Sequence, residues 1–354
     1  MPNNQILPNR QKVIARRNQK GFTLIELIIS IIIFLIVTSA VYGVMRIAMQ
    51  SRSAVNQEVP LTKNTRFSLN TIGRDTLNAG FDYPLKNTVK LPDNRVSALL
   101  NIPNDFDNTQ DIVPPIIAGN NITLNASSNS LTDQVTYLFK DSTFNLVGAA
   151  GKQVSQSLSI NAASTVGGID QIVPVAGSTA ACSVNDIYVI TGNTGSTLGV
   201  ATEISGGNTI KFANGDPLGF NLSGTAGPLR GITTPASIQR MRMVTYFVST
   251  DGILNRREYA NAAATTFVDE PLIYGVENLQ IQYILGDGTV SDNPSAGVDG
   301  VPGTADDIQA NLATVRQIRF TISVRSIELN SAGQPNRVTM TSTFGTRNLG
   351  YDPN

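Results

Sequence analysis

The chain has 354 residues, enough for one large or two modest domains, and carries 26 basic and 26 acidic side chains. It has no histidine, which excludes Ser-His and Cys-His nucleophile pairs and histidine-ligated metal sites. It has one cysteine, Cys182, which excludes an intramolecular disulfide and which we expect to be a buried core thiol.

The first 21 residues form a basic leader whose charged side chains are all Lys or Arg. These five residues are Arg10, Lys12, Arg16, Arg17 and Lys20. A basic segment before an apolar one stays in the cytoplasm, so we expect the chain after about Met45 to be exported. Without the leader the net charge is about −5, which argues against bulk electrostatic binding to nucleic acid.

An apolar segment of 23 residues, Phe22–Val44, follows the leader. At ~1.5 Å per residue it is long enough to cross a hydrocarbon core of ~30 Å as a helix. Its only charged side chain is Glu26, and an acid inside a membrane helix costs up to ~3 kcal/mol unless it has a partner. A cut after Gly21 would create such a partner, the Phe22 amine of the same or a neighbouring chain.

The run Gly21-Phe22-Thr23-Leu24-Ile25-Glu26 resembles the processing motif of type IV prepilins and type II secretion pseudopilins. The resemblance implies that a membrane prepilin peptidase cuts after Gly21 and methylates Phe22. It also implies that Glu26 is required for assembly with other minor and major pilins.

Two other interpretations of the N-terminus stay open. One is an ordinary secretory signal cut after Thr38-Ser39-Ala40, and the other is an uncleaved signal anchor. Mass spectrometry of the mature N-terminus separates the three interpretations. Methyl-Phe22 indicates a prepilin, Val41 a secretory signal, and an intact leader a signal anchor.

After the membrane segment we expect the helix to continue, to break or kink at Pro60, and to resume over Thr62–Asn78 with Phe67, Ile72 and Leu77 on one face. Gly80 is its expected C-terminal cap. The run Arg74-Asp75-Thr76-Leu77-Asn78-Ala79-Gly80-Phe81 resembles minor pilins of the PilW type and, more loosely, the J-type minor pseudopilins.

The rest of the chain is expected to be rich in β-structure. Residues 81–131 are predicted as loops and short strands, and the following region, rich in Gly, Ser, Thr and Asn, has three strand candidates. These candidates are Gln134–Phe139, Asp186–Thr191 and Thr209–Phe212.

The C-terminal third has the clearest alternation of apolar and polar residues. It predicts strands around Arg240–Val248, Ile253–Tyr259, Leu279–Leu285, Ile318–Arg325 and Arg337–Arg347, with a hairpin turn at Asp251-Gly252.

We therefore expect an α+β, type IV pilin-like fold, with a long hydrophobic helix packed on a twisted antiparallel sheet and an enlarged, loop-rich β middle region. The expected segments are a leader (1–21), a membrane and assembly helix (22–79), the middle region (80–232) and the C-terminal sheet (233–354).

An acidic loop separates two of the predicted C-terminal strands. Its Asp299, Asp306 and Asp307 could supply carboxylates to calcium, but their spacing is not that of an EF-hand. A solvated loop with Asp-Gly turns is the alternative.

The resemblance implies a minor pilin that helps to initiate pilus assembly at or near the tip. It would be held in the inner membrane as a prepilin, with its C-terminal domain in the periplasm, and then displayed on the pilus. The alternatives are a minor pseudopilin of a type II secretion system and a tip adhesin on a pilin stem. No catalytic constellation is visible, so we do not expect an enzyme.

Overall fold

The computed structural model describes residues 21–84, 89–103, 110–175, 181–206, 208–222, 229, 232–259, 266–295, 297, 310–330 and 333–349. The chain divides into two compact units, Met1–Val55 and Asn56–Asn354. Among the described residues, every strand and two short helices lie in the second unit.

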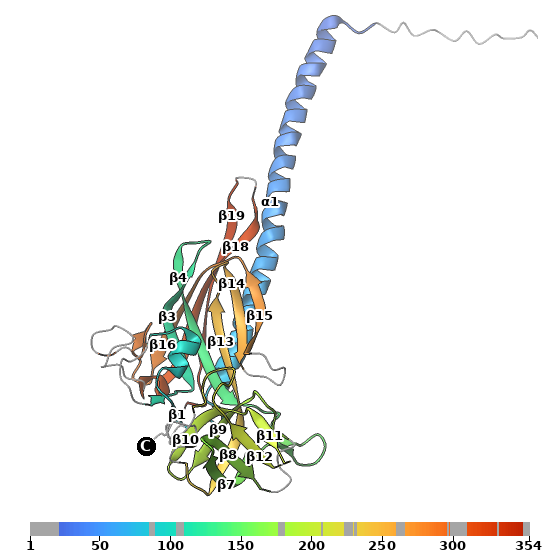
Figure 1. Cartoon of the computed structure of the whole chain (residues 1–354). Helices are drawn as coiled ribbons and strands as arrows, with labels where there is room; N and C mark the ends of the chain where they lie inside the picture. The colour runs from blue at the N-terminus through green and yellow to red at the C-terminus, as the bar shows by residue number, and fades with distance from the viewer. Residues whose placement is uncertain are drawn as a thin grey trace, which may run out of the picture. The chain divides into compact units, whose positions relative to one another are not determined.

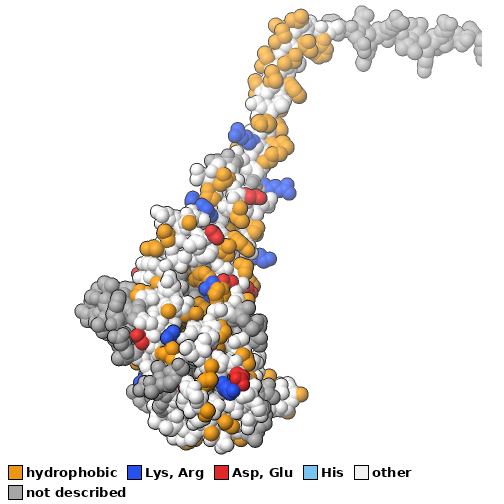
Figure 2. Space-filling model, in the orientation of Figure 1, with side chains coloured by type: hydrophobic (Ala, Val, Ile, Leu, Met, Phe, Trp, Pro, Cys, Tyr) orange, Lys and Arg blue, Asp and Glu red, His pale blue; other side chains and the backbone are white. Residues whose placement is uncertain are grey.

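One long helix, α1, covers Leu24–Asn78. Within the first unit its large hydrophobic side chains are exposed, and Figure 2 shows them along the N-terminal part of the helix. By length and composition this part can cross a membrane. The predicted membrane-length helix is therefore present.

The helix continues through Pro60, so the break expected there is absent, whereas a kink at this residue stays a prediction. A proline inside a helix removes one backbone hydrogen bond and clashes with the preceding turn. The following turns pack their side chains against the strands, with Leu69 and Ile72 almost completely buried. Tertiary packing of this kind supplies most of the stability of a protein helix and offsets the lost bond.

The buried face of this part of α1 also differs from the expected one. Phe67 is 62% exposed, whereas Ile72 is fully buried and Leu77 is intermediate. The buried positions are Thr65, Ser68, Leu69, Ile72, Gly73, Asp75, Thr76 and Ala79. These positions follow the three- and four-residue spacing of a helix face, which Phe67, Ile72 and Leu77 do not.

Gly80 ends the helix, as predicted. Its φ of 74° is in the left-handed region that favours glycine, and its N–H donates a hydrogen bond to the Leu138 carbonyl at 2.9 Å. A Cβ atom at this position would lie 2.7 Å from Cδ2 of Leu349. The chain therefore leaves α1 in close contact with the C-terminal residues.

A four-stranded antiparallel sheet has the order β17-β16-β18-β19. The bounds are β16 Val276–Leu285, β17 Val290–Ser291, β18 Val315–Leu329 and β19 Pro335–Gly345, with the short helix α3, Ala310–Ala313, before β18. The predicted alternation is confirmed, because Leu279, Ile281, Phe320 and Ile322 are buried and the residues between them are not.

A thirteen-stranded mixed sheet forms the rest of the second unit, together with a small two-stranded sheet of β5 and β6 (Figure 1). Its main path is β11-β12-β8-β7-β13-β9-β10-β1-β2, with β4 and β14 also paired to β13, β3 to β4 and β15 to β14. All its pairs are antiparallel except β1 with β10.

The bounds of these strands before Val200 are β1 Val89–Leu91, β2 Asp111–Ile112, β3 Ile116–Asn125, β4 Ser130–Lys140, β5 Leu146–Val147, β6 Val154–Ser155, β7 Leu158–Val166, β8 Ile169–Pro174, β9 Ile187–Gly192 and β10 Gly195–Val200. The later ones are β11 Glu203–Ser205, β12 Thr209–Phe212, β13 Ala236–Val248, β14 Ile253–Tyr259 and β15 Phe267–Tyr274.

Strand β13 connects two parts of the large sheet. Its N-terminal half pairs with β9 and β7, and its C-terminal half pairs with β4 and β14. One core, which includes Leu69 and Ile72, joins α1 to this second half and to the four-stranded sheet. A separate core around Phe144, Tyr188 and Phe212 lies under β7, β8, β9 and β12 and contains no residue of α1.

The expected α+β pilin-like fold is thus confirmed, and the middle region is more ordered than predicted. Each of the three strand candidates there is a strand, and a short helix, α2, covers Arg95–Leu100. The predicted hairpin is present, with Asp251-Gly252 between the paired Val248 and Leu254. Strand β15 was not predicted.

Candidate processing and assembly site

The start of α1 carries the predicted processing and assembly residues. Phe22 precedes the helix and is 81% exposed. Glu26 lies in the first turn, and its Oε2 accepts hydrogen bonds from the Thr23 hydroxyl at 2.8 Å and the Thr23 backbone N–H at 3.0 Å. In return, the Glu26 N–H donates to the Thr23 hydroxyl oxygen at 3.3 Å.

This reciprocal arrangement is a capping box, in which a Thr and a Glu three residues later satisfy the free N–H groups of a helix start. The sequence analysis did not assign a role to Thr23. The Thr-x-x-Glu spacing before an apolar run was the signal that could have found it.

The capping box also determines what Glu26 can do. Its Oε2 holds both Thr23 donors, and no hydrogen bond of Oε1 is present among the described residues. Since Phe22 is bonded to Thr23, the carboxylate lies close to the point where cleavage after Gly21 would create an amine. One oxygen can cap the helix while the other accepts a bond from such an amine, in the same chain or a neighbouring one.

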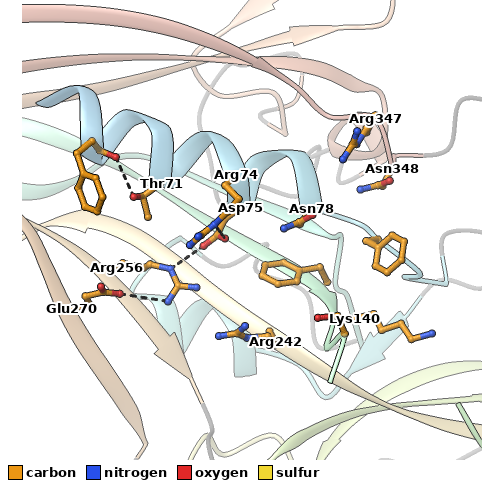
Figure 3. A pocket seen from close by; sticks show the side chains of 14 residues that line it. Thr71, Arg74, Asp75, Asn78, Lys140, Arg242, Arg256, Glu270, Arg347 and Asn348 are labelled. Carbon is orange, nitrogen blue, oxygen red and sulfur yellow. Dashed lines mark hydrogen bonds and ion pairs between the residues drawn. The ribbon is translucent and has the colours of Figure 1, made fainter. Parts of the chain in front are cut away.

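Residues 74–81 carry the second resemblance. In the structure, Asp75 and Thr76 of this segment hold the end of α1 against the strands. Asp75 is 3% exposed, and its Oδ2 accepts hydrogen bonds from Tyr246 Oη at 2.7 Å and Arg256 Nε at 2.8 Å. Figure 3 shows Asp75 and Arg256 directed toward each other, with Glu270 on the other side of the guanidinium. The neighbouring Thr76 hydroxyl shares a hydrogen bond of 2.8 Å with Tyr137.

The ionisation of Arg256 follows from these contacts. Burial alone would lower the pKa of the guanidinium, but the charge of Asp75 and the hydrogen bonds around it outweigh burial and raise the pKa. Arg256 therefore stays charged, and its guanidinium joins β14 to Asp75 of α1.

A cleft of 780 Å³ opens beside this pair and is lined by five basic side chains. These are Arg74, Lys140, Arg242, Arg256 and Arg347. Four of them have acidic partners: Lys140 pairs with Asp82, Arg242 with Glu258, Arg256 with Asp75 and, at 3.8 Å, Arg74 also with Asp75. Most of the positive charge in the cleft is therefore already compensated.

The proposed calcium residues Asp299, Asp306 and Asp307 lie outside the described residues. Within the part of the chain that the structure describes, no group of three or more acidic or cysteine side chains could hold a metal ion. Cys182 is buried as expected, and burial raises the pKa of its thiol to about 11.

A family model described as the prokaryotic N-terminal methylation motif matches residues 16–42. No curated protein and no solved structure matches the chain. The matched segment contains Gly21, Phe22 and Glu26 and coincides with the start of the membrane-length helix. The methylation motif, this helix and the α+β fold together support a protein of the type IV pilin or pseudopilin class.

Proposed function

We propose that the chain is a minor pilin of a type IV pilus, cut after Gly21 and methylated at Phe22. The observation that carries the proposal is the position of Glu26. It is the only acid in a membrane-length apolar segment, and its carboxylate is bound only to Thr23 among the described residues. In an apolar environment such a group requires a cation, and the Phe22 amine of a neighbouring subunit supplies one.

The rest of the assembly pathway follows from the charge pattern. The basic leader keeps the N-terminus in the cytoplasm, and the second unit is carried to the periplasm. The inner membrane holds the prepilin through α1 until prepilin peptidase removes the leader. An ion pair between Glu26 and a neighbour's amine then fixes the axial register between subunits, which is the best-attested use of a buried charge.

A tip or initiating position is favoured by the size of the second unit. Its strands surround cores that extend well beyond α1, including the separate core under β7, β8, β9 and β12. Close lateral packing recurs along a pilus shaft and leaves little room for such a lobe, whereas a subunit at the tip has free space on one side. Uniform antibody labelling along the filament would contradict this position.

The second candidate is a tip adhesin on a pilin stem. It is favoured by the same separate core, since a lobe packed without α1 can present surface loops without disturbing the assembly helix. A minor pseudopilin of a type II secretion system would share the N-terminal chemistry, and a secretion defect in place of a pilus defect would identify it.

Deletion of the gene, followed by a count of surface filaments, tests the proposal. Near-total loss of filaments is the result expected for a priming subunit, and normal filaments with lost adhesion would indicate the tip adhesin. Calcium in the loop that holds Asp299, Asp306 and Asp307 is a separate proposal, tested by thermal unfolding in calcium and in chelator with Asp299→Ala as control.

A further inference from the structure

The edge strands of the sheets differ in how well they are protected against pairing with another chain. An edge strand exposes unpaired backbone N–H and C=O groups, and proteins protect such edges with short strands, bulges, prolines or charges. In the described part of the chain, β2, β5, β6, β11 and β17 are two or three residues long. These strands are too short to hold a partner strand.

The two long edges of the large sheet are interrupted. Strand β3 has a bulge between Gly119 and Thr123. Strand β15 has an irregular register opposite Leu254 and Asn255, contains Pro271, and carries Asp269 and Glu270. Each feature prevents continuous backbone pairing.

Strand β19 has none of these features over most of its length. It pairs only with β18, in unbroken register from Arg337 to Gly345. After Arg337 the strand contains no charge and no proline as far as Gly345. The edge of β16 is also without a strand partner before its two-residue pairing with β17, but Asn125 bonds to its Val276 carbonyl and Asp133 to its Ile281 N–H. Among the described residues, β19 is the long edge with no such protection.

The ladder to β18 determines which groups point outward. The Thr346 N–H donates to the Arg316 carbonyl at 2.9 Å, so these two residues form a hydrogen-bonded pair in the antiparallel ladder. Because such pairs alternate, Met340 and Ser342 bond to β18, while the N–H and C=O groups of Thr339, Thr341 and Thr343 point away from it.

The outer face of the strand is a row of hydroxyl groups. Thr339, Thr341 and Thr343 are exposed, and the first two share hydrogen bonds with Ser323 at 2.9 Å and Thr321 at 3.0 Å. A strand with small, uncharged β-branched or hydroxyl residues matches this surface, because cross-strand Thr and Ser pairs stabilise a sheet.

A second copy of this chain is a poor partner in a twofold arrangement. Asn336 contacts Gln57, and Asn348 contacts the Leu77 carbonyl, so β19 and this part of α1 run in the same direction. Antiparallel pairing of two β19 strands would place the two copies' Gln57 residues at opposite ends of the joint sheet, about 35 Å apart at ~3.4 Å per residue. The parts of α1 after Asn56 would then run in opposite directions in the two copies, which is not the arrangement that we expect of subunits anchored in one membrane.

We propose that β19 binds an extended strand of a different pilin-type subunit anchored in the same membrane, by backbone pairing along Thr339–Thr343. This inference rests on the proposed function, because the shared membrane defines the direction in which the partner runs. The partner strand adds to the four-stranded sheet, as in other cases of β-strand addition.

A photoreactive benzophenone amino acid at Thr341, in the full chain expressed with its assembly, tests the pairing. The matched control has the same group at Val268, an exposed position on the protected edge β15. We expect Thr341 to cross-link to a different protein that carries an N-terminal methylation motif, within an extended segment, and Val268 not to do so. No adduct, an equal adduct from both positions, or an adduct with a second copy would overturn the proposal.

Proline substitution tests the backbone role. Thr341→Pro removes an N–H that β18 does not use, so the melting temperature of the purified chain should change by only a few degrees while the adduct from a benzophenone at Thr343 falls at least tenfold. Ser342→Pro removes an N–H that β18 uses and should unfold the sheet. If Thr341→Pro does not fold, Thr341→Lys gives the same test through charge. An unchanged adduct in a folded variant would contradict the pairing.

The mature N-terminus, measured in the same cells, separates the two proposals. Methyl-Phe22 without a Thr341 adduct rejects the β19 interface alone, whereas an intact leader rejects the proposed processing itself.

Discussion

Asp75 near the end of α1 and Arg256 on β14 form a buried ion pair, with Asp75 Oδ2 2.8 Å from Arg256 Nε. The same oxygen accepts the Tyr246 hydroxyl from β13 at 2.7 Å. One carboxylate thus joins the assembly helix to two central strands of the large sheet. Together with the core around Leu69 and Ile72, this contact attaches the C-terminal half of α1 to the sheets.

We predict that Asp75→Asn lowers the free energy of unfolding of the second unit by about 3 kcal/mol. Loss of one partner from a buried ion pair leaves the other charge uncompensated, which is far more costly than loss of a surface pair. Urea denaturation of the detergent-solubilised chain, followed by circular dichroism, measures the change.

Arg74→Gln is the matched control for this prediction. Arg74 is adjacent in sequence, but its side chain is 71% exposed and its Nε is 3.8 Å from Asp75. A surface pair of this kind contributes roughly 0–1 kcal/mol. Equal losses in the two variants would contradict the role assigned to the buried pair.

The sequence was sufficient where neighbouring residues determine the structure. Alternation predicted β16 and β18, and the Asp-Gly pair predicted the hairpin between β13 and β14. Strand β15 was missed because Pro271 and its acidic residues are typical of a loop, although an edge strand tolerates them. Continuity of α1 through Pro60 depends on packing that the local sequence does not contain.

At the candidate site too, the sequence predicted the residues of a local motif but not the contacts between distant residues. The processing residues and Glu26 follow from a local motif, and Thr23 could have been found from the same six residues. The partners of Asp75 could not, since Tyr246 and Arg256 are 171 and 181 residues away along the chain. A contact over that distance depends on the topology of the sheet, which propensities and periodicity do not encode.

Asp133 gives the second unit a specific dependence on pH. Burial raises the pKa of this carboxyl from 3.8 to about 6, although it accepts hydrogen bonds from the Asn121 and Ile281 N–H groups. The folded state therefore binds this proton more tightly than the unfolded state. The contribution of the group to stability is present below about pH 4 and is lost as pH rises through about 6.

We predict that Asp133→Asn removes this part of the pH profile. The difference in unfolding free energy between wild type and variant should change by about 2–3 kcal/mol from pH 4 to pH 7, with the wild type losing more stability as pH rises. The lost hydrogen bond of the amide adds a penalty that does not depend on pH, so the slope is the readout. Parallel profiles for the two proteins would show that Asp133 titrates normally.

Cys182 should be chemically silent in the folded chain. It is buried, and with a pKa of about 11 only about a thousandth of the thiol is ionised at pH 8. We expect iodoacetamide to leave it unmodified in native protein and to alkylate it fully in denaturant, as measured by mass spectrometry. Ser157→Cys, at an exposed position, should react in the native state. Equal labelling of both thiols would show that the core around Cys182 opens readily.

Two substitutions at the start of α1 separate helix capping from charge pairing. Thr23→Val keeps the Glu26 charge but removes the hydroxyl that donates to it at 2.8 Å, whereas Glu26→Gln keeps an oxygen that can accept from Thr23 but removes the charge. If Glu26 acts by pairing with a neighbour's Phe22 amine, Glu26→Gln should reduce incorporation into filaments at least tenfold, and Thr23→Val should leave it within about twofold. If capping is the requirement, the order is reversed, because the loss of an N-cap costs about 1 kcal/mol. Both variants should still be cut after Gly21, so mass spectrometry of the N-terminus and immunoblots of sheared pili distinguish a processing defect from an assembly defect.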